Sequence, residues 1–154
     1  MTTIRSRTIG SAGPAPLALR ILALLLGVFF VFQGISKLPW LFDSSILAGR
    51  LQDWLGGAPA DSVRWYIETI ARPGLPLFAR LVPLAELSTG VALVLGFWPR
   101  LFAALALAMV VNFHFALGSY FSWEFLIDGA GLPVMGGLLA LVIGGARLPW
   151  SVRA

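Results

Sequence analysis

The chain has 154 residues, of which 58% are hydrophobic and 12% are charged, and its formal net charge is +4. Its mean hydropathy of +0.88 is far above that of a soluble domain of this length, so the composition indicates a protein embedded in the lipid bilayer. The sequence has no cysteine and one histidine. We therefore exclude thiol chemistry and cysteine-ligated metals on this chain, and we expect neither a metal site nor a covalently bound cofactor.

Four hydrophobic stretches are long enough to cross a bilayer, which takes about 20 helical residues. They cover approximately Leu17–Leu38, Leu75–Phe97, Leu101–Gly118 and Gly129–Leu148. The sequence thus predicts an all-α protein, an integral membrane four-helix bundle with an up-down-up-down course and one domain over residues 1–154.

The segment between the first two stretches, Pro39–Gly74, has a different pattern. Residues 43–57, DSSILAGRLQDWLGG, and residues 61–72, DSVRWYIETIAR, each place apolar side chains on one side of a helix. We expect two short amphipathic helices that lie on the outer surface or cap the bundle. They are either a packed connector or a lid over a substrate or partner.

Charged residues separate into two groups along the chain. One side of the predicted membrane carries arginines without any acid: Arg5, Arg7, Arg20, Arg100, Arg147 and Arg153. By the positive-inside rule both termini are cytoplasmic, and Pro39–Gly74 is extracytoplasmic. The net positive charge thus reflects membrane topology, and we expect no nucleic-acid partner.

Small residues recur at every fourth position in the last two stretches. In the third stretch these are Ala104, Ala108 and Ala116, with Asn112 in the same series, and in the fourth they are Gly136, Ala140 and Gly144. We expect these faces to pack against neighbouring helices, with an interhelical hydrogen bond from Asn112. Four spans leave little room for a self-contained transporter unless the protein forms a homo-oligomer.

Glu86 lies near the middle of the second stretch. A charge at the bilayer centre costs about 2.5–3.5 kcal/mol on insertion scales, so Glu86 should face the bundle interior, be paired or be protonated. Pro83 leaves the carbonyl of Ala79 without its helical donor and should kink the helix, and both residues share one face with Glu86 and Gly90. We expect Arg80 to be the partner of Glu86, either in a structural ion pair or in a proton, quinone or ligand site.

Other polar side chains lie in the predicted outer half of the spans, where Gln33, Arg80 and His114 are roughly 6–8 Å inside the boundary. His114 is either a hydrogen-bonded structural histidine or a proton carrier. It is separated from Asn112 by about 200° on the helical wheel, so the two side chains cannot enter one pocket. Lys37 follows Gln33 by one turn, at a helix end where lysines usually extend to the interface. The candidate catalytic residues are Glu86, Arg80 and His114, and the candidate ligand-binding residues are Gln33, Lys37 and Asn112.

Several of these segments carry a family resemblance. RILALLLGVFFVFQGISKL, then AELSTGVALVLGFWPRLFAALALAMVVNFHF, an acidic WEF and a glycine-rich span ending in RLPW resemble the DoxX-like membrane proteins. The matching features are Gly34 and Lys37 in the first span, Glu86 and Gly90 in the second, and the GFWPR turn.

This resemblance implies a four-helix protein of the bacterial inner membrane. Some relatives are the membrane subunit of thiosulfate:quinone oxidoreductase, and others belong to oxidative-stress complexes. On this basis we expect a redox membrane subunit that works with an extracytoplasmic or membrane partner and offers quinone a site near the outer leaflet. The alternative is a non-catalytic membrane scaffold or a small permeation protein.

Overall fold

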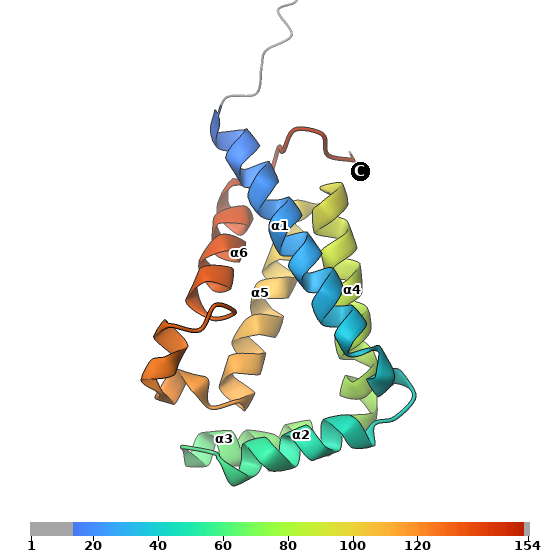
Figure 1. The fold of residues 1–154 in the computed structure, drawn as a ribbon, viewed down its shortest axis with the longest axis vertical. Helices are drawn as coiled ribbons and strands as arrows, with labels where there is room; N and C mark the ends of the chain where they lie inside the picture. The colour runs from blue at the N-terminus through green and yellow to red at the C-terminus, as the bar shows by residue number, and fades with distance from the viewer. Residues whose placement is uncertain (1–13, 153–154) are drawn as a thin grey trace, which may run out of the picture.

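The computed structural model describes residues 14–152, and every regular element in that range is helical. Four helices run roughly lengthwise (Figure 1): α1 (Pro14–Ser36), α4 (Leu75–Leu95), α5 (Pro99–Ala116) and α6 (Leu132–Gly144). Helices α1 and α5 each contact both α4 and α6. Three of the arginines used to predict orientation, Arg5, Arg7 and Arg153, lie outside the described residues.

Three of these helices are long and apolar enough to cross a membrane: Ala15–Ser36 within α1, all of α4 and all of α5. Each also exposes large hydrophobic side chains along one side. On α1 these recur every three or four residues, at Leu17, Ile21, Leu25, Val28, Phe32 and Ile35. A continuous exposed apolar stripe of this kind suits lipid and not water, so the structure agrees with a membrane protein.

The fourth apolar helix is shorter than the sequence predicted. We expected a span over Gly129–Leu148, but α6 has 13 residues and is therefore about 20 Å long. A turn at Asp128–Gly131 precedes it, and it ends at the Gly144–Gly145 pair. The glycines at both ends kept the stretch apolar enough for us to predict a full span, but glycine does not favour helix.

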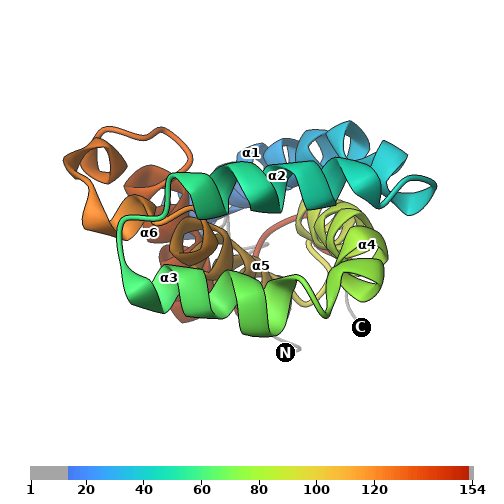
Figure 2. The same cartoon turned by 90° about the horizontal axis from the view of Figure 1, so that it is seen from below.

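Two helices lie across one end of this group (Figures 1 and 2), α2 (Ser45–Gly56) and α3 (Asp61–Tyr66). A π-helical turn, η2 (Ile67–Ala71), continues α3 toward α4. Below α1, a short 3₁₀ helix, η1 (Leu38–Leu41), leads into α2, and η3 (Ser119–Phe121) and η4 (Trp123–Leu126) connect α5 to α6. The apolar sides of α2, α3 and η2 form a core of their own with the first turns of α4.

The closest approach between helices occurs where α1 crosses α4. A Cβ atom on Gly90 would lie 2.6 Å from the backbone nitrogen of Val31 and 2.8 Å from the carbonyl oxygen of Gly27. A Cβ atom on Gly34 would lie 2.9 Å from the backbone nitrogen of Leu87. The two backbones are therefore in contact, and only glycine fits at these positions.

The small-residue faces that we predicted on α5 and α6 are right in part. Ala116 is buried, and a Cβ atom on Gly144 would lie 2.6 Å from the side chain of Leu19 on α1, but other members do not pack as predicted. Ala104 and Ala108 are exposed, and α5 instead buries Ala103, Ala106 and Val110. On α6 nothing lies within 4 Å of a Cβ atom built on Gly136, and the buried residues are Val134, Leu138 and Leu141. Alanines occupy more than one face of α5, so their spacing alone does not identify the packed face.

Arginines hold the opposite end of the molecule, which we call the basic end: the start of α1, the α4–α5 turn and residues 144–152. Arg20, only 5% exposed, donates hydrogen bonds to the carbonyls of Leu93 (3.0 Å) and Val94 (2.6 Å) in the last turn of α4. Arg100 donates to Val142 (2.8 Å) and Ile143 (3.1 Å) at the end of α6. Both guanidinium groups thus satisfy carbonyls at the negative ends of helix dipoles.

Candidate functional site

A cavity of about 210 Å³ lies between α1, α4 and α5, near the ends of α1 and α5 that adjoin α2. Its polar lining residues are Gln33, Lys37, Arg50, Glu86, His114 and Asp128. Its aromatic lining residues are Phe29, Phe30, Trp40, Trp54 and Phe113. The structure thus brings Gln33, Lys37, Glu86 and His114, all singled out from the sequence, into one cavity.

Lys37 and Glu86 form an ion pair in this cavity. The Lys37 ammonium lies 2.8 Å from Oε2 and 2.9 Å from Oε1 of Glu86, and it also donates to Oε1 of Gln33 at 3.0 Å. The side chains of Lys37 and Glu86 are 14% and 4% exposed. Burying two charges costs free energy, so each member of this enclosed pair needs the other as its partner.

Glu86 lies near the middle of α4 but level with the end of α1. Its position in α4 suggested the middle of the membrane, but Gly34 packs on the backbone at Pro83 and Leu87, which sets Glu86 level with the last turn of α1. The first turns of α4 extend past α1 and pack into the second core with α2 and α3, where Ala79 is fully buried. The two helices α1 and α4 are therefore offset along their length, and the depth of Glu86 in the membrane stays a prediction.

Arg80 is not the partner of Glu86, contrary to our prediction. It is exposed, and its Nη1 donates to the carbonyl of Pro76 one turn earlier on the same helix, at 2.6 Å. Helical geometry places Arg80 about 120° around α4 from Glu86, and α4 continues as one helix through Pro83 without bringing them together. Ala79, Pro83, Glu86 and Gly90 do share one face, and all four are buried.

His114 is buried, at 5% exposure, and both ring nitrogens contact the connection between α5 and α6. Nδ1 lies 2.8 Å from the hydroxyl of Ser119, and Nε2 lies 3.2 Å from the carbonyl oxygen of Ala130. A carbonyl only accepts hydrogen bonds, so Nε2 carries a proton in this arrangement. Oδ2 of Asp128 lies 3.9 Å from Nδ1.

Asn112 does not take part in this cavity. Its Oδ1 accepts a hydrogen bond from the Tyr66 hydroxyl at 2.6 Å, which joins α5 to α3. The side chains of Asn112 and His114 diverge, as their angular separation on the helix predicts. The expected interhelical hydrogen bond from Asn112 exists, but it reaches the layer across the helix ends and not another span.

The cavity also has polar and aromatic lining residues that were not among the predicted site residues, including Trp40, Arg50, Trp54 and Asp128. Arg50 and Lys37 both face the ring of Trp40, at 5.6 Å and 6.0 Å from its centroid. Trp54 lies on the apolar side that the sequence predicted for the first amphipathic helix. No local signal in the sequence indicated that this side faces a cavity, because that depends on how α2 folds back over α1 and α5.

The arrangement combines flat apolar walls with groups that donate hydrogen bonds and exchange protons. Lys37, Arg50 and Gln33 can donate to a ligand, while Glu86 and Asp128 are carboxylates and His114 is an imidazole. Within residues 14–152, no three His, Asp or Glu side chains come together as a metal site would require. The cavity can therefore hold a planar polar ring and move protons to or from it.

An all-α protein with apolar, lipid-facing helices and a polar cavity between them belongs to the integral membrane proteins. Residues 15–118 match the family model of DoxX, which covers α1 through α5. The chain therefore belongs to the DoxX family, and the resemblance seen in the sequence is confirmed. No curated protein and no solved structure matches the chain.

Proposed function

We propose that this DoxX family protein is the membrane subunit of a redox system and that the cavity between α1, α4 and α5 binds the head group of a quinone. The observation that carries the proposal is the Lys37–Glu86 pair inside a cavity walled by aromatic rings. A quinone presents a flat ring for stacking and two carbonyls that accept hydrogen bonds. Its reduction to quinol takes up two electrons and two protons.

Cavity size supports a head group and not a whole lipid-like molecule. At about 210 Å³ it is smaller than typical ligand pockets of roughly 300–1,000 Å³, so it suits one substituted ring whose tail leaves toward the lipid. Lys37 would donate a hydrogen bond to one carbonyl, and Glu86, which is ionised in the pair, would take up the two protons in turn from water and pass them to the reduced oxygens. Because the chain has no cysteine, the electrons come from a partner subunit that carries the electron donor, such as a reduced sulfur compound.

In this proposal the protein is a four-helix bundle of the bacterial cytoplasmic membrane, with α6 as a short fourth span. Both termini are cytoplasmic, since Arg20, Arg100 and Arg147 lie at one end while α2 and α3 lie at the other. The quinone site is then near the outer leaflet, beneath α2 and α3, and the redox partner docks from outside. A homo-oligomer is compatible with this arrangement but is not required by it.

Quinone binding can be measured through the tryptophans of the cavity. A soluble quinone analogue added to the full chain in mild detergent should quench tryptophan fluorescence saturably. Replacing the wall residue, Trp54→Phe, should reduce the quenched fraction, while Trp98→Phe at the basic end should not. Organic extraction of the freshly purified protein should also yield quinone. Absence of bound quinone, of saturable quenching and of any co-purifying redox partner would refute the proposal.

Access to the cavity can be tested independently, because the native chain lacks cysteine. Gln33→Cys and Val110→Cys, two positions that line the cavity, should react slowly with a membrane-impermeant thiol reagent, and the quinone analogue should slow them further. Arg80→Cys is the matched control, since this exposed position should react at a rate that quinone does not change. Equal protection of all three positions by quinone would place the ligand outside this cavity.

The same ion pair also favours a second candidate function. Lys37 and Glu86 join α1 to α4, so they could serve assembly alone in a non-catalytic scaffold or small permeation protein. Under that alternative, variants of the pair change only the stability of the fold. Under the quinone proposal, a variant that keeps its fold still loses quinone affinity.

A further inference from the structure

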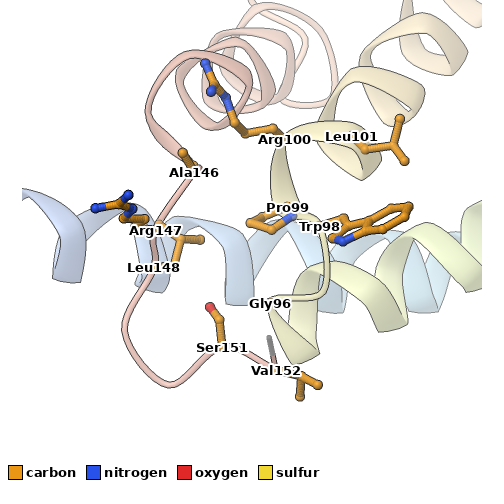
Figure 3. A pocket seen from close by; sticks show the side chains of 11 residues that line it. Gly96, Trp98, Pro99, Arg100, Leu101, Ala146, Arg147, Leu148, Ser151 and Val152 are labelled. Atoms are coloured by element: carbon orange, nitrogen blue, oxygen red, sulfur yellow. The ribbon is translucent and has the colours of Figure 1, made fainter. Parts of the chain in front are cut away.

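A second, larger hollow lies at the basic end, opposite the proposed quinone site. It has a volume of about 760 Å³ and is formed by the α4–α5 turn and residues 145–152 (Figure 3). The residues used below are Trp98, Arg100, Arg147 and Ser151, all of which line it. Two bonds fix the C-terminal segment as its wall: Val152 donates to the carbonyl of Leu95 (3.1 Å), and Arg20 contacts that of Trp150 (3.5 Å).

Charge in this hollow has one sign. Within residues 14–152, Arg100 and Arg147 line it and no carboxylate does. Arg100 uses Nε and Nη2 to bind the end of α6, so it contributes positive charge to the hollow from that side. Arg147 lies at the rim with its guanidinium directed away from the other lining residues, so it meets a ligand at the mouth and not at the floor (Figure 3). An anion is therefore the complementary ligand.

Two further groups in the hollow lack protein partners. The hydroxyl of Ser151 is buried and makes no hydrogen bond within the described residues. The hollow also includes the first turn of α5, where Arg100 and Leu101 carry backbone amides that a helix leaves unpaired. Together with the arginines, these donors provide the surroundings that a phosphate group requires.

The position of the hollow distinguishes a lipid from a free anion. It lies where α4 and α6 end and α5 begins, which is the level of the lipid headgroups for helices that cross a membrane. Trp98 and Trp150 are exposed by 54% and 77% there, as tryptophans at a membrane interface are.

An apolar groove of about 500 Å³ runs along α4 on the exposed side, from Leu84 to Phe97 and Phe102. The ring of Phe97 stacks on Trp98 with centroids 5.3 Å apart, so the groove and the hollow meet at this aromatic pair. A phospholipid could place its headgroup in the hollow and an acyl chain in the groove. We propose that the basic end is a binding site for an acidic phospholipid, with the phosphate near Ser151 and the first turn of α5 and with Arg147 at the mouth of the hollow.

The test uses the full chain in neutral detergent, titrated with dioleoyl phosphatidylglycerol and observed by native mass spectrometry and thermal unfolding. The expected result is retained phosphatidylglycerol and a higher Tm, with much weaker effects of dioleoyl phosphatidylcholine. Arg147→Gln should lower phosphatidylglycerol affinity about fivefold, the effect of one basic residue near a charged membrane surface. Ser151→Ala should lower it about two- to fivefold while leaving the lipid-free Tm unchanged, because the hydroxyl has no partner to lose.

The matched control is Arg64→Gln, which removes one exposed positive charge from α3 at the far end and should leave lipid affinity unchanged. Three outcomes overturn the proposal. Equal binding of the two lipids, or wild-type affinity in both Arg147→Gln and Ser151→Ala, removes the phosphate site. Inorganic phosphate or glycerol 3-phosphate that raises Tm as much as phosphatidylglycerol assigns the site to a free anion. A polyglutamate peptide that binds while no lipid is retained assigns it to a protein partner.

Discussion

The Lys37–Glu86 pair should respond unequally to removal of its two members. Within the described residues, the Glu86 carboxylate accepts hydrogen bonds from Lys37 alone, at 2.8 and 2.9 Å. Lys37 has a second acceptor in Gln33, whose Oε1 and backbone oxygen lie 3.0 and 3.4 Å from the ammonium. Lys37→Met thus leaves an enclosed carboxylate without a donor, whereas Glu86→Gln leaves the ammonium with acceptors.

From these contacts we expect Lys37→Met to lower the free energy of unfolding by about 3–5 kcal/mol, the cost of breaking a buried pair by removing one partner. Glu86→Gln should cost about 1–3 kcal/mol, because the amide still accepts a hydrogen bond. The double variant Lys37→Met with Glu86→Met should lose less unfolding free energy than Lys37→Met alone. No charge is left without a partner in the double variant.

Unfolding in mixed micelles of mild detergent and sodium dodecyl sulfate, followed by circular dichroism, measures these free energies. Glu86→Gln costing as much as Lys37→Met would refute the assigned hydrogen bonds. A double variant whose cost equals the sum of the costs of Lys37→Met and Glu86→Met, each measured alone, would show that the two residues are not coupled. The folded double variant is also the sample in which quinone affinity should be lost.

Three further predictions concern the packing of the helices. Gly90→Ala should destabilise the protein by about 1–3 kcal/mol because its Cβ meets the backbone of α1, whereas Gly136→Ala should be neutral or stabilising because nothing lies within 4 Å. Arg20→Gln should cost roughly 2–4 kcal/mol in unfolding free energy, since it removes charged hydrogen bonds from the end of α4. Tyr66→Phe should cost about 1 kcal/mol and increase hydrogen exchange in α3, because it removes the bond to Asn112.

Each of these has an outcome that would contradict it. Equal stability of Gly90→Ala and Gly136→Ala would mean that α1 and α4 do not touch backbone to backbone. Wild-type stability of Arg20→Gln would mean that the guanidinium is in solvent and not on α4. Unchanged exchange in α3 after Tyr66→Phe, with exchange measured residue by residue, would mean that α3 is held by its apolar side alone.

Hydropathy was sufficient to locate the long helices, because the cost of exposing backbone and charge to lipid constrains α1, α4 and α5 strongly. It overestimated α6, since glycine is counted as apolar and yet does not favour helix. Periodicity failed on α5: Ala103 and Ala106 are buried while Ala104 and Ala108 are exposed, and an alanine face can meet either lipid or protein.

The sequence predicted several residues of the candidate site, but it did not predict which of them contact one another. Gln33, Lys37, Glu86 and His114 could be chosen because polar side chains are costly inside a membrane. The partner of Glu86 could not be predicted in the same way, because it depends on the register at which α1 crosses α4. That register follows from backbone contact at Gly27, Gly34 and Gly90. The contact joins two helices that are distant in the chain, so the pattern of one helix alone does not predict it.

The two bonds from Arg20 to α4 bear on how the protein is made. Their acceptors, Leu93 and Val94, are translated 73 and 74 residues after the arginine. In the proposed orientation Arg20 first retains the N-terminus on the cytoplasmic side as a free charge, and it becomes buried only when α4 has been inserted. Arg20 thus first directs how the chain inserts and is later buried against α4, a helix that inserts after it. Shifting this charge to invert the topology should therefore yield a protein that folds in neither orientation.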